Sequence, residues 1–212
     1  MVRRTAGPAV TTIEVFADVA CPFTHVGLRR FTQRREQLGR HDVTLLVRAW
    51  PLEVVNGQPL DPAASAAKIS DLRRQVAPDL FSGFTEAAFP ATSLPALALV
   101  AAAYDKDLAT GERVSLDLRD LLFEQGRDIA DPAVLHAVAA EHALTVGPAH
   151  EQQVLDDHAD GVRRGVIGSP HFFTPAGDFF CPALNVGHDP SGRLELTADP
   201  DTLDRFTAAC FA

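Results

Sequence analysis

The sequence predicts an α/β fold in which two separated parts of the chain form one sheet, with a block of helices inserted between them. Three observations carry this prediction: a strand–helix–strand pattern at the start, an alanine-rich helical middle, and a strand–strand–helix pattern at the end. The chain has 212 residues and 46% hydrophobic content, which is enough to bury such a core. We therefore assign residues 12–61 and 150–212 to the sheet domain and residues 62–149 to an inserted helical subdomain.

The first part of the chain reads as a β-α-β unit. Residues 12–17 (Thr-Ile-Glu-Val-Phe-Ala) have the composition of a buried strand. Pro22 suits the first turn of the next helix, which we expect to run to about Leu38 and to end at Gly39. Residues 43–50 form a second apolar run. Strands joined in this way are parallel, with a right-handed connection.

The middle of the chain is predicted to be helical throughout. Its segments are separated by helix-breaking or helix-starting signals such as Asp131-Pro132, an N-cap followed by proline at the first helical position. The expected helices are residues 62–76, 94–106, 115–125, 132–141 and 150–164.

Strand character returns at residues 170–174 and 178–181, on either side of a Pro-Ala-Gly turn. This spacing predicts a β-hairpin with a three-residue connection. In that register Thr174 lies opposite Asp178, and His171 lies opposite Cys181. A last helix is expected from residue 200 to about residue 210.

One cysteine lies where the first strand gives way to the first helix. Cys21 follows the mostly apolar residues 15–20, which include Asp18, and immediately precedes Pro22. At a helix N-terminus, unpaired backbone N–H groups and the helix dipole favour a thiolate over a thiol. Thr24 lies one turn further on, within reach for its hydroxyl to donate a hydrogen bond to the Cys21 sulfur. We expect Cys21 to be a nucleophile; the alternative is a buried structural cysteine.

Two titratable residues flank this cysteine, and the sequence leaves their roles open. His25 lies four residues after Cys21, on the same helix face. It is either an imidazolium that holds the thiolate, a neutral base that takes the thiol proton, or a surface or packing histidine. Asp18 is either a buried proton acceptor beneath the site or a cap for the turn.

Three stretches of sequence carry a resemblance to a known family. They are residues 18–27 (Asp-Val-Ala-Cys-Pro-Phe-Thr-His-Val-Gly), 123–132 (Phe-Glu-Gln-Gly-Arg-Asp-Ile-Ala-Asp-Pro) and 165–172 (Gly-Val-Ile-Gly-Ser-Pro-His-Phe). They resemble the DsbA-like thioredoxin-fold family, in the branch that includes 2-hydroxychromene-2-carboxylate isomerases and kappa-class glutathione transferases. The resemblance implies a thioredoxin-like fold with an inserted all-helical subdomain.

The third stretch contains the substrate platform that the resemblance implies. In the family the proline of this loop is cis, and here that proline is Pro170. A cis proline would leave the backbone N–H and C=O of Ser169 free to pair with an extended peptide or with glutathione. Pro22 and Phe23 complete the substrate-binding set. From the residues alone, an ordinary trans proline opening an edge strand is the alternative.

The active-site motif departs from the family pattern at its second cysteine. The family has Cys-Pro-aromatic-Cys or Ser-Pro-aromatic-Ser, whereas this chain has Thr24 at the last position. Disulfide exchange needs a second thiol to release the mixed disulfide, and a threonine cannot supply it. Cys181 is a candidate resolving thiol because the predicted hairpin places it beside Pro170; the alternative is a small buried hydrophobe. Cys210 is expected to be structural.

Composition and charge exclude several function classes. A net charge of −9 argues against nonspecific binding to nucleic acid or to anionic membranes. The most apolar stretch, residues 94–104, is too short to span a bilayer. Arg3-Arg4 is not followed by the apolar region of a secretory signal, and three cysteines do not form a disulfide framework. We expect a cytoplasmic protein.

The same residues set expectations for cofactors and partners. Cys21, His25, His171 and Cys181 are of types that bind zinc, but their scattered spacing argues against a metal site. We expect no tightly bound cofactor, with glutathione or another low-molecular-weight thiol as co-substrate. The expected partner is a protein or small-molecule disulfide or thiol, and the protein itself is expected to be a monomer or a homodimer.

The sequence therefore predicts a thiol–disulfide oxidoreductase in which Cys21 is the single nucleophile and a second thiol resolves the mixed disulfide. One alternative is a glutathione transferase or isomerase of the kappa-class or chromene-carboxylate type. The other is a non-catalytic thioredoxin-fold module that binds peptides at Ser169-Pro170.

Overall fold

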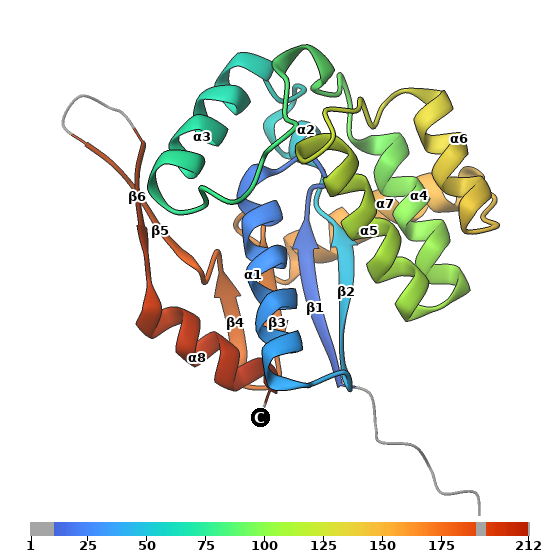
Figure 1. The fold of residues 1–212 in the computed structure, drawn as a ribbon. Helices are drawn as coiled ribbons and strands as arrows, with labels where there is room; N and C mark the ends of the chain where they lie inside the picture. Colours follow the sequence, from blue (N-terminus) through green and yellow to red (C-terminus); the bar gives the residue numbers. More distant parts are fainter. Residues whose placement is uncertain (1–10, 190–193, 212) are drawn as a thin grey trace, which may run out of the picture.

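A mixed four-stranded sheet lies at the centre of the molecule (Figure 1). The computed structural model describes residues 11–189 and 194–211. The first two strands are parallel and the last two are antiparallel to their neighbours. In spatial order the strands are β2 (Val43–Ala49), β1 (Thr11–Ala17), β3 (His171–Thr174) and β4 (Gly177–Phe180). Two distant parts of the chain thus share one sheet, as the sequence predicts.

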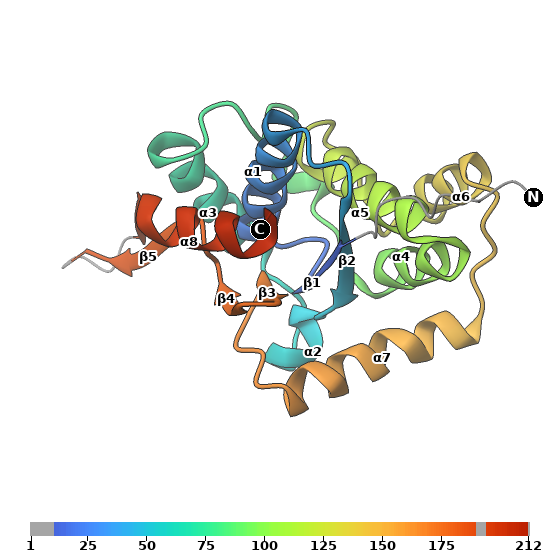
Figure 2. The same ribbon diagram turned by 90° about the horizontal axis from the view of Figure 1, so that it is seen from below.

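Helices cover both faces of this sheet (Figure 2). Helices α1 (Pro22–Leu38) and α8 (Pro200–Phe211) lie on one face, where Ile13 and Val15 of β1 share a buried cluster with Phe31 and Phe206. Helix α7 (Pro148–Arg163) lies on the other face. There Phe16, the intervening residue of β1, packs edge-on against Trp50. The alternation of apolar residues along β1 therefore supplies both cores.

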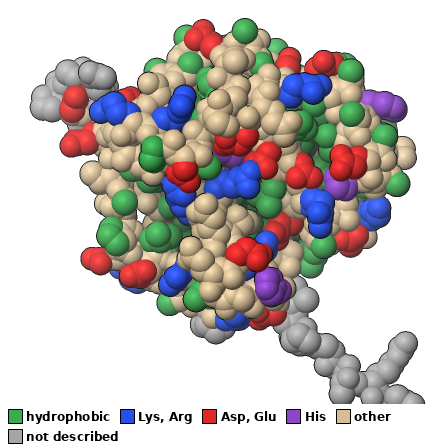
Figure 3. Space-filling model, viewed as in Figure 1, with side chains coloured by type: hydrophobic (Ala, Val, Ile, Leu, Met, Phe, Trp, Pro, Cys, Tyr) green, Lys and Arg blue, Asp and Glu red, His purple; other side chains and the backbone are tan. Residues whose placement is uncertain are grey.

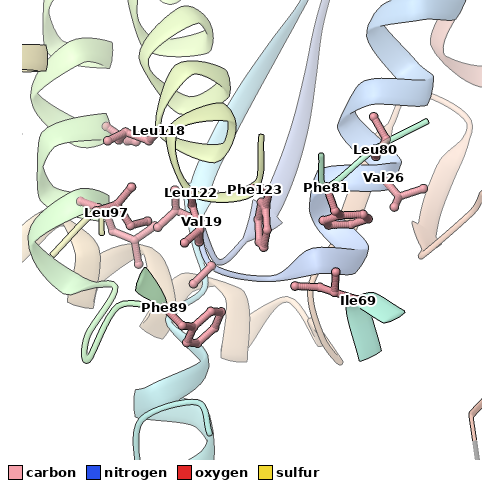
Figure 4. Close-up of a cluster of buried hydrophobic side chains, with 14 of the residues drawn as sticks. Val19, Val26, Ile69, Leu80, Phe81, Phe89, Leu97, Leu118, Leu122 and Phe123 are labelled. Atoms are coloured by element: carbon pink, nitrogen blue, oxygen red, sulfur yellow. The ribbon is translucent and has the colours of Figure 1, made fainter. Parts of the chain in front are cut away.

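The remaining long helices follow β2 and build a further core beside the sheet. Val19, in the loop before α1, packs with Leu97, Leu118 and Leu122, so the turn that ends in Cys21 is anchored to the helical layer (Figure 4). These helices are α3 (Pro62–Gln75), α4 (Leu94–Lys106), α5 (Leu108–Phe123) and α6 (Pro132–Glu141).

Side chains of the helices satisfy the free edge of β2. The Leu45 N–H donates to Glu112 Oε2 at 2.7 Å, and the Tyr104 hydroxyl both accepts from Val47 N at 2.9 Å and donates to Leu45 O at 2.9 Å. An exposed strand edge invites pairing with another chain, and here the edge is closed by the protein's own helices.

Several elements differ from the sequence prediction. Helix α5 begins at Leu108 rather than at residue 115, because Asp107 caps it by accepting from Thr110 N at 2.7 Å. Gly111 inside this helix is required by close packing, since a Cβ there would overlap the Tyr104 ring. Helix α2 (Leu52–Asn56), a short 3-10 helix (Glu86–Ala88) and a second sheet of β5 (Leu184–His188) and β6 (Leu194–Ala198) were not predicted.

The predicted register of the β3–β4 hairpin is wrong by one residue. Thr174 pairs with Gly177 and His171 pairs with Phe180, so the connection contains only two residues. The Thr174 hydroxyl fixes this tighter turn by donating to Gly177 O at 2.8 Å and accepting from Ala176 N at 3.2 Å. Cys181 consequently lies just beyond the strand rather than opposite His171.

The surface carries charges of both signs. On the face shown in Figure 3, basic and acidic side chains are interspersed rather than gathered into patches of one sign. Among residues 11–189 and 194–211, no helix is long and apolar enough to cross a membrane.

Candidate functional site

Cys21 is the N-cap residue of helix α1, with Pro22 in the first turn of that helix. Its backbone is extended (φ −80°, ψ 117°), and only 3% of its surface is exposed. The thiol donates a hydrogen bond to the backbone carbonyl of Ser169, with 3.3 Å between Cys21 Sγ and Ser169 O. The strand–cysteine–proline–helix pattern therefore places this sulfur at a helix N-terminus and brings it to the loop that the sequence predicts as its platform.

The peptide bond between Ser169 and Pro170 is cis. Helix α1 packs directly on this loop, since a Cβ at Gly27 would lie 3.4 Å from Pro170 Cγ. The sequence predicts a free Ser169 carbonyl. In the structure this carbonyl accepts a hydrogen bond from the Cys21 thiol. That hydrogen bond exists only while the sulfur carries its proton. Phe23, the aromatic residue of the motif, is half-buried against the helical core.

The Thr24 hydroxyl is directed to Ser169 rather than to Cys21. Thr24 Oγ1 and Ser169 Oγ are 2.7 Å apart and share a hydrogen bond, while Ser169 Oγ also accepts from Asp18 N at 2.9 Å. The predicted hydrogen bond from Thr24 to the Cys21 sulfur is therefore wrong. The threonine fixes the cis-proline loop to helix α1 instead.

His25 points away from the cysteine. Its Nε2 lies 2.7 Å from Glu124 Oε1, and its buried ring packs against Phe81 and Phe123. Burial lowers the pKa of His25, although the neighbouring carboxylate opposes that shift. Of the three roles left open for His25 by the sequence, this placement favours the packing histidine.

Glu124 belongs to the second motif and ties three segments together. Burial alone would raise its pKa, but hydrogen bonds from His25, from the N–H groups of Phe81 and Ser82 and from the Ser82 hydroxyl lower the pKa to about 2. The resemblance of residues 123–132 to the family was the signal that pointed to this corner. Its contacts with His25 were not foreseen.

Asp18 is fully buried beneath the turn that leads to Cys21. Its Oδ1 accepts from Ala20 N at 2.8 Å, and its Oδ2 accepts from Leu52 N at 2.7 Å and from the Ser93 hydroxyl at 3.0 Å. Burial raises its pKa, and these hydrogen bonds only partly oppose that shift. Asp18 thus caps the turn and is also a buried acid close to the thiol, so both readings left open by the sequence fit its surroundings.

Arg119 is a residue of this site that the sequence analysis missed. It lies in helix α5 with 1% of its surface exposed, and its Nη2 donates to the Asp18 carbonyl at 3.2 Å. An arginine in an amphipathic helix is normally expected on the surface. Only its place one turn after the buried Ser115 could have suggested otherwise.

Cys181 is bonded to the cis-proline loop through its backbone. Its N–H donates to Pro170 O at 3.0 Å, and its backbone is left-handed (φ 45°). Burial, with a smaller contribution from the charge of Cys21, raises the pKa of the Cys181 thiol to about 12. The two cysteines therefore flank successive carbonyls of one loop, and all three cysteines of the chain are free thiols.

The described ranges contain no group of three or more histidine, cysteine, aspartate or glutamate side chains that could hold a metal ion. Cys21 contacts Ser169, His25 contacts Glu124 and His171 contacts Asp178, so the residues considered from the sequence have separate partners.

Comparison with known proteins places the chain in a family. A model described as a DSBA-like thioredoxin domain matches residues 12–190. The structure is similar to the cytosolic disulfide reductase DsbM from Pseudomonas aeruginosa, with a TM-score of 0.59 and 16% identity over 93% of this chain and 95% of that chain. The same reductase with GSH gives a TM-score of 0.59 and 19% identity over 93% and 96%.

A 2-hydroxychromene-2-carboxylate isomerase is also similar, with a TM-score of 0.55 and 14% identity over 80% of this chain and 88% of that chain. At these identities the structural likeness concerns the fold alone. No curated protein matches the chain significantly. The family model covers most of the chain, and the fold agrees with it: the protein belongs to the DsbA-like thioredoxin-domain family.

Proposed function

We propose that this protein is a thiol–disulfide oxidoreductase that works with a single nucleophilic cysteine. The observation that carries the proposal is the position of Cys21, at the N-terminus of α1 with its sulfur 3.3 Å from the carbonyl that precedes the cis proline. A thiolate at a helix N-terminus is a good nucleophile and a good leaving group.

In the first step the Cys21 thiolate attacks one sulfur of a substrate disulfide. A bond forms between Cys21 Sγ and that sulfur, the substrate S–S bond breaks, and the other substrate sulfur leaves as a thiolate. Loss of the Cys21 proton also removes the hydrogen bond to Ser169 O, which leaves this carbonyl free to accept from a substrate backbone N–H.

In the second step an external thiolate attacks the sulfur of the bound substrate. Cys21 leaves as a thiolate, and the substrate departs as a disulfide with the external thiol. Glutathione is the external thiol we propose, because the similar reductase DsbM has been determined with GSH and because Thr24 cannot resolve the adduct. A reducing cytoplasm, the compartment expected from the sequence, would supply it.

Cys181 is less suited to the second step. A thiol with a pKa of about 12 is ionised in only about one molecule in 10⁵ at neutral pH, and the thiolate is the attacking species. Formation of the Cys21 adduct removes the charge of Cys21 but leaves the larger effect of burial. We therefore assign resolution to the external thiol.

The test is reduction of a small mixed disulfide with glutathione as the electron donor, measured for the wild type, Cys21→Ser and Cys181→Ser. Loss of activity in Cys21→Ser is expected, because serine cannot form the adduct. Cys181→Ser, a matched control that removes a buried thiol on the same loop, is expected to keep most of the activity.

Two results would change this proposal. Activity that survives Cys21→Ser and requires glutathione would favour a transferase or isomerase. Loss of activity in Cys181→Ser at unchanged stability would assign the second step to Cys181.

A further inference from the structure

The site contains a buried positive charge that the proposed reaction has not yet used. Arg119 Nη1 donates to both the carbonyl and the hydroxyl of Ser115, each at 2.6 Å, and Nη2 donates to the Asp18 carbonyl at 3.2 Å. Its Nε has no hydrogen-bond partner, and no carboxylate lies within 4.0 Å of the guanidinium in the part of the chain that the structure describes. The charge is therefore held by neutral groups only.

A buried guanidinium without an ion pair is costly, because the charge loses its hydration. Burial lowers the pKa of Arg119 to about 10, and the charges of Asp18 and Cys21 oppose this shift. At neutral pH the side chain is still a cation. A costly charge of this kind, close to a candidate nucleophile, indicates a functional requirement.

Arg119 and Cys21 meet at one backbone atom. The Asp18 carbonyl that accepts from Arg119 Nη2 also accepts from the Cys21 N–H at 3.3 Å. The guanidinium thus lies directly behind the turn from Asp18 to Cys21. Both Asp18 and Cys21 are almost fully buried, so water screens the electrostatic interaction among the three groups weakly.

We propose that Arg119 is a positioning residue that stabilises the thiolate of Cys21, by supplying the positive charge of a buried cluster formed with Asp18. This inference rests on the proposed function and adds the group that controls its nucleophile. It also applies to the second step, because Cys21 must leave the mixed disulfide as a thiolate.

The charges in the cluster balance when one of its two acids is ionised. Burial raises the pKa of Asp18, which favours its protonated form, and a protonated Asp18 with a Cys21 thiolate and Arg119 gives no net charge. The other titratable or charged groups near the cluster come from several elements. They are Tyr104, Asp120 with its partner Arg29, Cys181 beside Cys21, Glu53, which shares the Ser93 hydroxyl with Asp18, and Arg48, Asp105 and Asp157, which line a cavity with Arg119.

These neighbours cannot supply the positive charge that Arg119 provides. Asp120 is paired with Arg29, and Asp157 is paired with Arg48. Burial raises the pKa of Tyr104 well above its ordinary value and that of Cys181 to about 12, so both stay neutral at physiological pH. Of the described cations near this cluster, Arg29 and Arg48 have carboxylate partners and Arg119 has none.

The experiment measures the pH at which alkylation of Cys21 by iodoacetamide reaches half its maximal rate, with Cys21 followed by peptide mass spectrometry. The variants are Arg119→Met and Arg119→Gln, which remove the charge, and Arg119→Lys, which keeps it. Arg113→Met is the matched control, since Arg113 is exposed on the same helix. Circular dichroism and cooperative melting verify that each variant is folded.

Removal of a nearby opposite charge moves a titration by about 1–3 pH units. We expect the half-maximal pH to rise by at least about 1 unit in the neutral variants, with most of the change restored by lysine and none caused by Arg113→Met. A purely structural role for Arg119 would alter melting without moving this pH.

An unchanged alkylation profile in a folded neutral variant overturns the inference. If neither neutral variant folds, Arg119→Lys decides, and a rise of more than about 1 unit despite the retained charge would overturn it. These outcomes are independent of the proposed function, which is tested separately by the activity of Cys21→Ser.

Discussion

At the scale of single residues, Ser169 connects the groups that define the site. Its carbonyl accepts the Cys21 thiol, and its hydroxyl bonds to Thr24 and accepts from Asp18 N. The hydrogen bond to its carbonyl exists only while the Cys21 sulfur carries its proton, and the same carbonyl is the substrate contact that we propose. Thr24 serves this arrangement through its hydroxyl rather than through chemistry on sulfur.

The position of Thr24 leads to a prediction about the missing second thiol. Residues three apart in the first turn of a helix are close enough for a disulfide, and Thr24→Cys restores the dithiol pattern of the family. Mild oxidation of this variant is expected to give an intramolecular disulfide between Cys21 and the introduced thiol. Intact-mass measurement after thiol blocking detects it.

Thr24→Val is the matched control, because it removes the hydroxyl without adding a thiol and should show no such bond. Four free thiols in oxidised Thr24→Cys, instead of the two that remain at Cys181 and Cys210 once the bond has formed, would contradict the assigned helical position of Cys21.

The residues that could be predicted are those whose signal is local. A strand, a cysteine, a proline and a helix in succession were enough to place Cys21, and Ser-Pro in the third motif was enough to place Ser169 beside it. The partner of Thr24 could not be foreseen, because Ser169 is 145 residues away in sequence. Arg119 was missed because a buried cation is exceptional and has no local pattern.

At the scale of elements, the same distinction holds. The strands and long helices were predicted from periodicity and caps, whereas β5 and β6 were missed. Each strand has only five residues, and Leu196 N is held by Gln75 of the distant helix α3 at 3.0 Å. The hairpin register failed because the Thr174 side chain, rather than loop length, sets the turn. The division into a sheet domain and a helical insertion stays a prediction.

The corner at Glu124 gives a prediction about how the elements are held together. A Cβ at Gly83 would overlap the Glu124 carbonyl, and Gly126 has a positive φ of 62° beside it. Gly83→Ala should therefore push the backbone at residue 83 away from Glu124. We expect it to lower the free energy of unfolding by about 1–3 kcal/mol, measured by denaturant unfolding.

Gly147→Ala is the control for that measurement, because a Cβ at Gly147 meets nothing within 4 Å. Equal effects of the two substitutions would show that close packing at Gly83 is unimportant.

At the scale of the whole molecule, the sheet and the helical layer meet around the turn before α1. Val19 packs into the helical core, Arg119 supports Asp18 from α5, and Glu124 binds His25 of α1 (Figure 4 shows Val19 in this core). The site is thus assembled from both parts of the structure, and its stability should depend on the ionisation of groups that join them.

Glu124 determines how the stability changes at acid pH. Its folded pKa of about 2 lies below its ordinary value of 4.5, so the stability it contributes is present above about pH 4.5 and is lost as the pH falls towards 2. Glu124→Gln is expected to cost about 1–3 kcal/mol at pH 7 and to reduce the loss of stability in this acid range. Urea unfolding from pH 7 to pH 3 measures both effects; an unchanged pH slope in the variant would contradict them.

The central claim is that Cys21 alone carries the substrate adduct. The most direct test is peptide mass spectrometry of the protein after reaction with oxidised glutathione. We predict a glutathione adduct on Cys21 in the wild type and in Cys181→Ser, and none at any cysteine in Cys21→Ser. A disulfide between Cys21 and Cys181, or a wild-type protein without an adduct on Cys21, would contradict the account.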